Sequence, residues 1–93
     1  MLFRSDAQQV LQRFLSADGR LLDLPTRHAK RLVVLDHVAQ RFEPGRRYDW
    51  REVDALLVQV HDDHAALRRA LVDEGFLTRQ SDVYWRSGGT VDV

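Results

Sequence analysis

The 93-residue sequence contains no cysteine, only five glycines and two prolines, and no excess of either charge, with 14 basic and 14 acidic residues. Without cysteine, the chain has no disulfide bond, no thiolate metal ligand and no cysteine nucleophile. No apolar run approaches the roughly 18 residues of a membrane span, and residues 1–6 lack the apolar segment of a signal peptide. We therefore expect a cytoplasmic protein that does not contact a membrane.

The overall composition is typical of a folded domain, with 44% hydrophobic and 30% charged residues. A chain of this length can bury one compact core, so we expect one domain over residues 1–93. The charges are unevenly distributed along the chain. Residues 1–48 carry nine bases and five acids, whereas residues 49–93 carry five bases and nine acids, which gives net charges of +4 and −4.

Apolar residues at helical spacing predict two helices in the first half of the chain. The first covers residues 5–16 and begins at a capping box formed by Ser5 and Gln8. The second begins at Thr26 as its N-cap and continues to about Phe42, and Pro44-Gly45 follows it. Residues 20–24 lie between the two helices and are predicted as a short strand.

Two further helices are predicted in close succession. Asp49 and Glu52 form a capping box before the apolar stripe of residues 53–60, and Asp62 or Asp63 can cap the next helix. That fourth helix buries Leu67, Ala70 and Leu71, and it ends at Gly75 in a Schellman motif. Residues 76–80 and 83–86 then alternate around Ser81-Asp82, which predicts a tight hairpin, and residues 87–93 are predicted as a flexible tail.

Helix, tight turn, helix and hairpin is the element order of a winged helix. We therefore predict a mainly α, α+β fold: a winged-helix-like bundle of four helices with a C-terminal two- or three-stranded wing. Residues 5–16 would be an extra helix, residues 26–86 the winged-helix core, and residues 20–24 the third strand of the wing. An all-α bundle is the alternative.

A set of short stretches is distributed over the chain: Asp18-Gly19-Arg20-Leu21, Leu24-Pro25, Arg46-Arg47-Tyr48, Glu52-Val53-Asp54, Asp63, Leu67-Arg68-Arg69, Leu71-Val72-Asp73 and Tyr84-Trp85-Arg86. Together these stretches resemble an uncharacterised bacterial family, domain of unknown function 2087. The resemblance implies an association with helix-turn-helix regulators of transcription and no catalytic residues. Asp54 departs from the asparagine that is usual in the family after Glu-Val.

Basic residues are the candidates for contacts with nucleic acid. Arg68 and Arg69 lie on the outer face of the predicted recognition helix, where arginine can contact guanine or phosphate. The other basic residues lie around the second helix, and we expect these to carry more of any binding. The full candidate set is Arg27, Lys30, Arg31, Arg46, Arg47, Arg68 and Arg69. The alternative is that they are surface charges paired with acids, Arg69 with Asp73 and Arg68 with Asp63 or Glu52.

Tyr84 and Trp85 are candidates for a protein interface. Neighbouring residues of a strand point to opposite faces, so one of the two rings packs on the core and the other lies outside. His61-Asp62-Asp63-His64 is the one cluster with metal-ligand chemistry, but its histidines straddle a predicted helix break. We expect a structural turn there rather than a metal site, and no cofactor.

Two functions are consistent with these features. The first is a non-enzymatic domain in transcription regulation that binds DNA weakly through basic surface residues. The alternative is a protein-interaction or dimerisation module that retains the winged-helix shape without binding DNA. The chain has no Gly-x-Ser-x-Gly setting and no phosphate-binding glycine loop, so no enzyme activity is expected. The opposite charges of its two halves favour a homodimer with Trp85 or Tyr84 in the contact.

Overall fold

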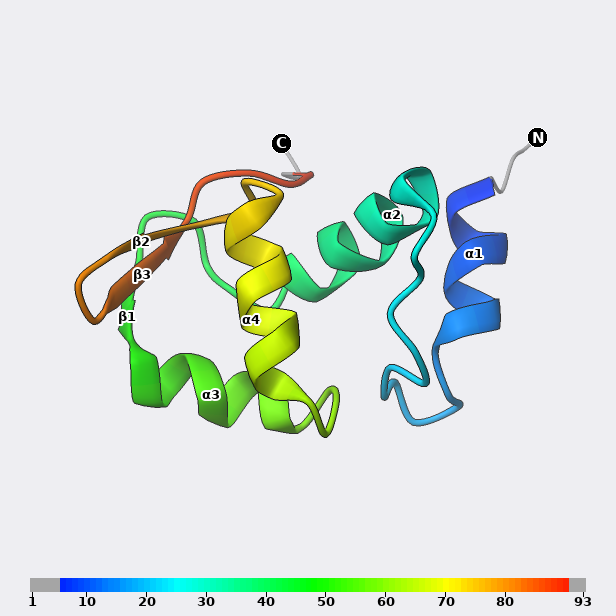
Figure 1. Ribbon diagram of the computed structural model, residues 1–93, viewed down its shortest axis with the longest axis horizontal. Coiled ribbons are helices and arrows are strands. Elements are labelled where there is room, and N and C mark those ends of the chain that lie inside the picture. The colour runs from blue at the N-terminus through cyan, green and yellow to red at the C-terminus, as the bar shows by residue number, and fades with distance from the viewer. Residues whose placement is uncertain (1–5, 91–93) are drawn as a thin grey trace.

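The computed structural model describes residues 6–90 of the chain. Within these residues it has four helices and one three-stranded antiparallel sheet, which confirms the predicted α+β class. The elements are α1 (Asp6–Phe14), α2 (His28–Ala39), β1 (Arg47–Asp49), α3 (Trp50–Val58), α4 (His64–Asp73), β2 (Leu77–Gln80) and β3 (Val83–Arg86). Figure 1 shows α1 beside α2 at one end of the molecule and the sheet at the other end, with α4 between them and α3 running below the sheet and α4. This arrangement is consistent with a winged-helix-like fold.

The sheet has the strand order β1-β3-β2, and β2 and β3 form the predicted hairpin. Its third strand is β1, where Arg47 pairs with Trp85 and Tyr48 with Tyr84. The prediction of a strand over residues 20–24 was wrong, because neighbouring backbone amides in this segment donate to two separate places, the turn after α3 and the end of α1. Leu21 donates to the carbonyl of Val60, and Leu22 donates to that of Phe14. No continuous ladder can form along such a segment.

Helix α2 is shorter at both ends than predicted. Its N-cap is Arg27 rather than Thr26, and no side chain caps it. At the other end, Gln40, Arg41 and Phe42 each donate to the carbonyl three residues earlier, so the helix tightens into a final turn beyond Ala39. Phe42 is nevertheless fully buried, as the apolar stripe predicted.

The predicted caps of α3 and α4 are confirmed. The Asp49 carboxylate accepts from the backbone of Arg51 and Glu52, and the Glu52 side chain accepts from the Asp49 amide in return. At the start of α4, Asp63 accepts from the Ala66 amide at 3.2 Å. The end of α4 is a Schellman motif in which Gly75 takes a φ of +84°.

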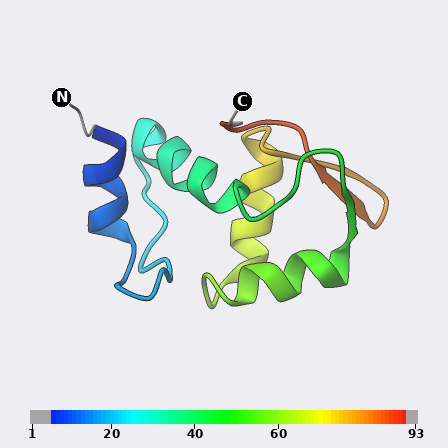
Figure 2. The same ribbon diagram turned by 180° about the vertical axis from the view of Figure 1, so that it is seen from behind.

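The core lies between α2, α3, α4 and the inner face of the sheet. Leu67, Ala70 and Leu71 are buried on α4, as predicted, and Tyr48 and Tyr84 are buried from the sheet side. The hydroxyl of Tyr48 still has a partner, because it accepts from the Glu43 amide at 2.8 Å. Helix α1 and the residue that follows it pack on this core through partly buried side chains, which are Val10, Leu11, Phe14 and Leu15. The view from behind in Figure 2 shows that α1 meets the rest of the fold beside α2.

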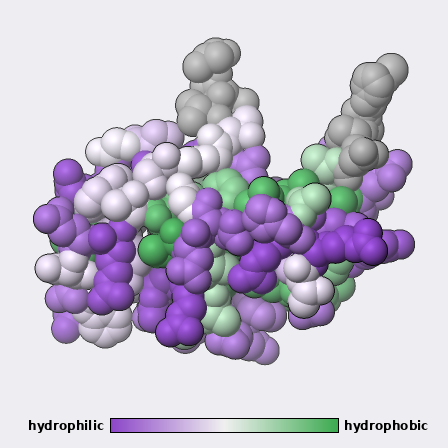
Figure 3. Space-filling model, turned by 45° about the horizontal axis from the view of Figure 1, so that its top comes forward, coloured by the Kyte–Doolittle hydropathy of each residue, from purple (hydrophilic) through white to green (hydrophobic). Residues whose placement is uncertain are grey.

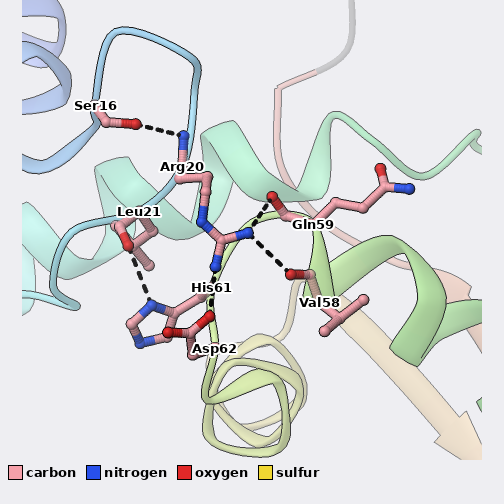
Figure 4. A network of polar contacts seen from close by, with 7 residues as sticks. All are labelled: Ser16, Arg20, Leu21, Val58, Gln59, His61 and Asp62. Carbon is pink, nitrogen blue, oxygen red and sulfur yellow. Dashed lines mark hydrogen bonds and ion pairs between the residues drawn. The ribbon is translucent and has the colours of Figure 1, made fainter.

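Arg20 fixes the turn between α3 and α4 from a distant part of the chain (Figure 4). Its guanidinium donates to the carbonyl oxygens of Val58 at 3.2 Å and Gln59 at 3.0 Å, and it pairs with Asp62 at 2.7 Å. These carbonyls belong to the last turn of α3, where a helix has no partners of its own for them. The α1–α2 connection thereby contacts both the end of α3 and the turn that leads to α4.

The segment after the hairpin, which was predicted as part of a flexible tail over residues 87–93, folds back onto α2. Ser87 and Gly88 donate backbone hydrogen bonds to the Phe76 carbonyl, and Thr90 is bound by Asp36. Residues 87–90 therefore make specific contacts with the rest of the fold, while residues 91–93 lie outside the described part. Ser5 also lies outside it, so the predicted capping box of α1 has no structural counterpart among the described residues.

Candidate nucleic-acid interface

An open groove of about 760 Å³ runs along the outer face of α4. The start of α2 and the segment before it form one wall, and the hairpin forms the other. Ala65 and Ala66 lie in the first turn of α4 and are exposed, so the helix backbone can be approached closely there. This is the face that a recognition helix turns toward DNA in a helix-turn-helix protein.

Four arginines from three elements line this groove. Arg31 comes from α2, Arg68 and Arg69 come from α4, and Arg79 comes from β2. Asp73 is the one carboxylate among the described residues that line it. The structure thus brings together three of the predicted arginines and adds Arg79, which is not among the predicted residues.

Two of the four guanidinium groups are already engaged by carboxylates. Arg68 is ion-paired with Asp54 of α3, with its side chain 27% exposed. Arg31 lies 3.8 Å from a Glu74 oxygen and also donates to the Pro25 carbonyl at 3.4 Å. A phosphate would have to compete with these carboxylates for both side chains.

The other two arginines of the groove have no ion pair within residues 6–90. Arg69 is exposed, and the predicted pair between Arg69 and Asp73 does not form. Arg79 is exposed as well; its Nε donates to the Ser81 carbonyl at 2.9 Å and its guanidinium lies over the Tyr84 ring. Arg69 and Arg79 are therefore the cations that a phosphate can reach without displacing an acid.

The partner predicted for Arg68 was wrong. The carboxylate of Asp63 accepts from the α4 backbone, and Glu52 instead pairs with Arg46 at 3.1 Å. Asp54 faces α4 and meets both Arg68 and the Nε2 of His64, the latter at 3.9 Å. The packing of α3 on α4 brings Asp54 to Arg68. The distance between these two residues along the chain does not indicate this contact.

The remaining predicted cations lie elsewhere. Arg46 and Arg47 flank the buried Tyr48 at β1, where Arg46 lies over the Tyr48 ring and Arg47 lies 4.4 Å from the centre of the Trp85 ring. Arg27 and Lys30 lie at the start of α2, and Lys30 lines a different groove, against α1. The seven predicted residues therefore do not form one surface.

The two aromatic residues of β3 point to opposite faces, as predicted. Tyr84 is 3% exposed and belongs to the core, so it offers no surface to a partner. Trp85 is partly exposed on the outer face of the sheet, with the Arg47 guanidinium stacked on its ring. Of the two predicted interface residues, only Trp85 remains available.

The histidines at the α3–α4 turn make contacts that hold the turn. The Nδ1 of His61 lies 3.1 Å from the Leu21 carbonyl, and His64 lies beside Asp54. Within residues 6–90, no group of three or more His, Asp or Glu side chains is placed to hold a metal ion. The same residues contain no helix long and apolar enough to cross a membrane.

The fold and the groove together define a small winged-helix-like α+β domain. The chain belongs to a family described as an uncharacterised protein conserved in bacteria, DUF2087, whose model matches residues 20–86. The matched range begins at Arg20, which holds the α3–α4 turn, and ends with β3; helix α1 precedes it. No curated protein and no solved structure matches the chain.

Proposed function

We propose that this domain binds double-stranded DNA weakly through the groove on α4 and has a regulatory rather than an enzymatic role in transcription. The observation that carries the proposal is the convergence of Arg31, Arg68, Arg69 and Arg79 on the exposed face of one helix, beside a hairpin. Arginine can contact both phosphates and the edge of guanine. The exposed alanines of the first turn of α4 leave room for the edges of the bases in the major groove. Of the basic residues around the second helix that were predicted to carry more of the binding, only Arg31 lies in this groove; Arg27, Lys30, Arg46 and Arg47 have no such geometric support.

The ion pairs limit the expected strength of binding. Each neutralised phosphate contributes a slope of about −0.9 to the dependence of log affinity on log salt concentration. If Arg69 and Arg79 alone reach phosphates, the slope is about −2; if Arg31 and Arg68 also exchange their acids for phosphates, it approaches −4. Binding through so few contacts is weak and largely independent of sequence.

Fluorescence anisotropy with a labelled random-sequence duplex, repeated over a range of salt concentrations, tests this proposal. The double variant Arg69→Ala/Arg79→Ala should lose binding, since both free cations of the groove are removed. Its matched control, Arg46→Ala/Arg47→Ala, removes the same charge at β1 and should retain binding. Loss of binding in the control alone, or no binding by the parent protein at low salt, would refute the α4 groove as the DNA site.

A protein-interaction or dimerisation module remains the second candidate, favoured by the stacked pair of Trp85 and Arg47 on the outer face of the sheet. Tryptophan and arginine are enriched at the centres of protein interfaces. Sedimentation at two salt concentrations should show a homodimer that Trp85→Ala weakens. If the protein is a monomer under all conditions, dimerisation through this surface is excluded.

A further inference from the structure

A second groove, of about 430 Å³, lies between α1 and α2. Its apolar walls are Val10 and Phe14 from α1 and Ala29 and Val33 from α2. Figure 3 shows hydrophobic surface over these two helices, interrupted by hydrophilic side chains. The volume falls in the range of small-molecule sites, which bind ligands mainly through apolar walls and a few polar groups.

The polar groups at this groove are cationic. Arg13 and Lys30 line it, and neither has an ion-pair partner within residues 6–90. No carboxylate is among the described residues that line the groove. Glu74 pairs with His28 and Arg31, which also belong to the first turns of α2, and it does not line this groove.

The first turn of α2 reinforces the positive character of this groove. Ala29 and Lys30 belong to that turn, where backbone amides have no partner within the helix. The N-cap Arg27 makes no side-chain hydrogen bond to them, and the turn contains no acidic residue. Such a helix start favours a negatively charged group nearby.

From these observations we propose that the α1–α2 groove binds a small carboxylic acid with an apolar body. The body lies against Phe14, Val10 and Val33, and the carboxylate lies between Arg13 and Lys30 at the start of α2. An uncharged apolar molecule would leave the two cations unpaired, and a purely polar anion would leave the apolar walls exposed to water. The ligand therefore has to combine both properties.

Isothermal titration calorimetry with decanoate, decanol and acetate tests this site. Decanoate should bind at least about ten times more tightly than either of the others, because each lacks one half of the required chemistry. Amide chemical shifts should move in α1 and the first half of α2. Equal binding of decanol, shifts confined to the α4 groove, or no decanoate binding would overturn the proposal.

Two variants separate the contributions to binding. Arg13→Gln/Lys30→Gln should weaken decanoate at least about tenfold without changing the fold, since neither side chain is buried. Ala29→Leu replaces an exposed small residue with one that fills the groove, and it should block decanoate as well. The matched control Arg51→Gln removes an exposed cation beside Trp50 and should bind decanoate as the parent protein does. Unchanged decanoate affinity in the groove variants would place the acid elsewhere.

Discussion

Asp36 on α2 accepts two hydrogen bonds from Thr90, one from its backbone amide and one from its hydroxyl, each 2.7 Å long. Gln40 adds a third link by donating to the Thr90 carbonyl at 2.8 Å, and Arg86 reaches the same carbonyl. The segment after the hairpin is thereby fastened to α2 and its C-cap. The Asp36 carboxylate thus joins α2 to Thr90, which lies 54 residues later in the chain.

This contact predicts a pH-dependent contribution to stability. Partial burial raises the pKa of Asp36, but the hydrogen bonds from Thr90 and Gln40 and the charge of Arg86 outweigh burial, and they hold the pKa below its ordinary value of 3.8. A carboxyl group whose pKa is lower in the folded than in the unfolded protein stabilises the fold at pH values above its unfolded-state pKa. This stabilisation is lost as the pH falls through the folded-state pKa.

Asp36→Asn should therefore lower the free energy of unfolding by about 1 kcal/mol near neutral pH and by much less at about pH 2. Urea denaturation of both proteins at the two pH values measures the difference. Hydrogen exchange at the Thr90 amide should also accelerate in the variant. A loss of stability that is the same at both pH values would show that the ionised carboxylate has no special role.

The buried stripe of α4 gives a second prediction. Leu67 and Leu71 are fully buried, and truncation of either to alanine removes core contacts and leaves a cavity. Each variant should lose about 2–5 kcal/mol in the free energy of unfolding, measured by urea or thermal denaturation. Val58→Ala, at a side chain that is 46% exposed on α3, is the matched control and should change stability by less than about 0.5 kcal/mol. Similar losses at Val58 and Leu67 would contradict the assigned orientation of the helices.

Local signals in the sequence account for what could be predicted. The capping box of Asp49 and Glu52, the cap at Asp63 and the glycine at position 75 each depend on residues within a few positions of one another. The apolar stripes then orient α3 and α4 correctly because helical spacing is itself a local property. These features were sufficient for the order of the four helices and the hairpin, and for most of the core.

The features that could not be predicted depend on contacts between distant residues. Strand β1 has three residues and forms only because β3 supplies a partner, so it leaves no alternation long enough to recognise. The candidate site was affected in the same way. The arginines of the groove converge through packing of α2, α4 and β2, and the choice of Asp54 as the partner of Arg68 depends on how α3 crosses α4.

Arg20 supplies a third prediction, because its guanidinium binds both carbonyls at the end of α3 and the Asp62 carboxylate. The Asp62 side chain is 98% exposed, so solvent screens the ion pair, and the pair contributes little to the free energy of unfolding. The hydrogen bonds to Val58 and Gln59 contribute more, since they satisfy carbonyls that the helix leaves unpaired. Arg20→Ala should therefore cost about 1–2 kcal/mol in the free energy of unfolding, whereas Asp62→Asn should cost less than about 0.5 kcal/mol.

Denaturation of the two variants distinguishes these contributions. If high salt removed most of the Arg20→Ala effect, or if both variants lost the same stability, the ion pair rather than the helix end would be the source of the stabilisation. Arg20→Lys gives a further comparison, because lysine keeps the charge but cannot match the planar fork of donors that reaches two carbonyls and a carboxylate. It should recover only part of the loss.

The pair of Arg68 and Asp54 gives the last prediction, which rests on the proposed DNA site. Asp54 holds the Arg68 guanidinium and neutralises it within the α4 groove. In Asp54→Asn the amide replaces the carboxylate, so Arg68 becomes free to contact a phosphate. The affinity for duplex DNA should rise, and the slope of log affinity against log salt should steepen by about 0.9, the contribution of one more phosphate. Folding stability should fall by about 1 kcal/mol because a partly buried ion pair is lost.

Glu52→Gln is the matched control for this experiment. It removes one negative charge from the same helix and frees Arg46, which lies outside the groove, while glutamine can still complete the capping box. Anisotropy measured for both variants over the same salt series separates a local effect from a change in net charge. A steeper slope in Asp54→Asn alone supports contact at the α4 groove, since only that variant adds a free cation there. Equal changes in the two variants would mean that DNA senses the overall charge of the domain, and Arg68 would then have no place in the interface.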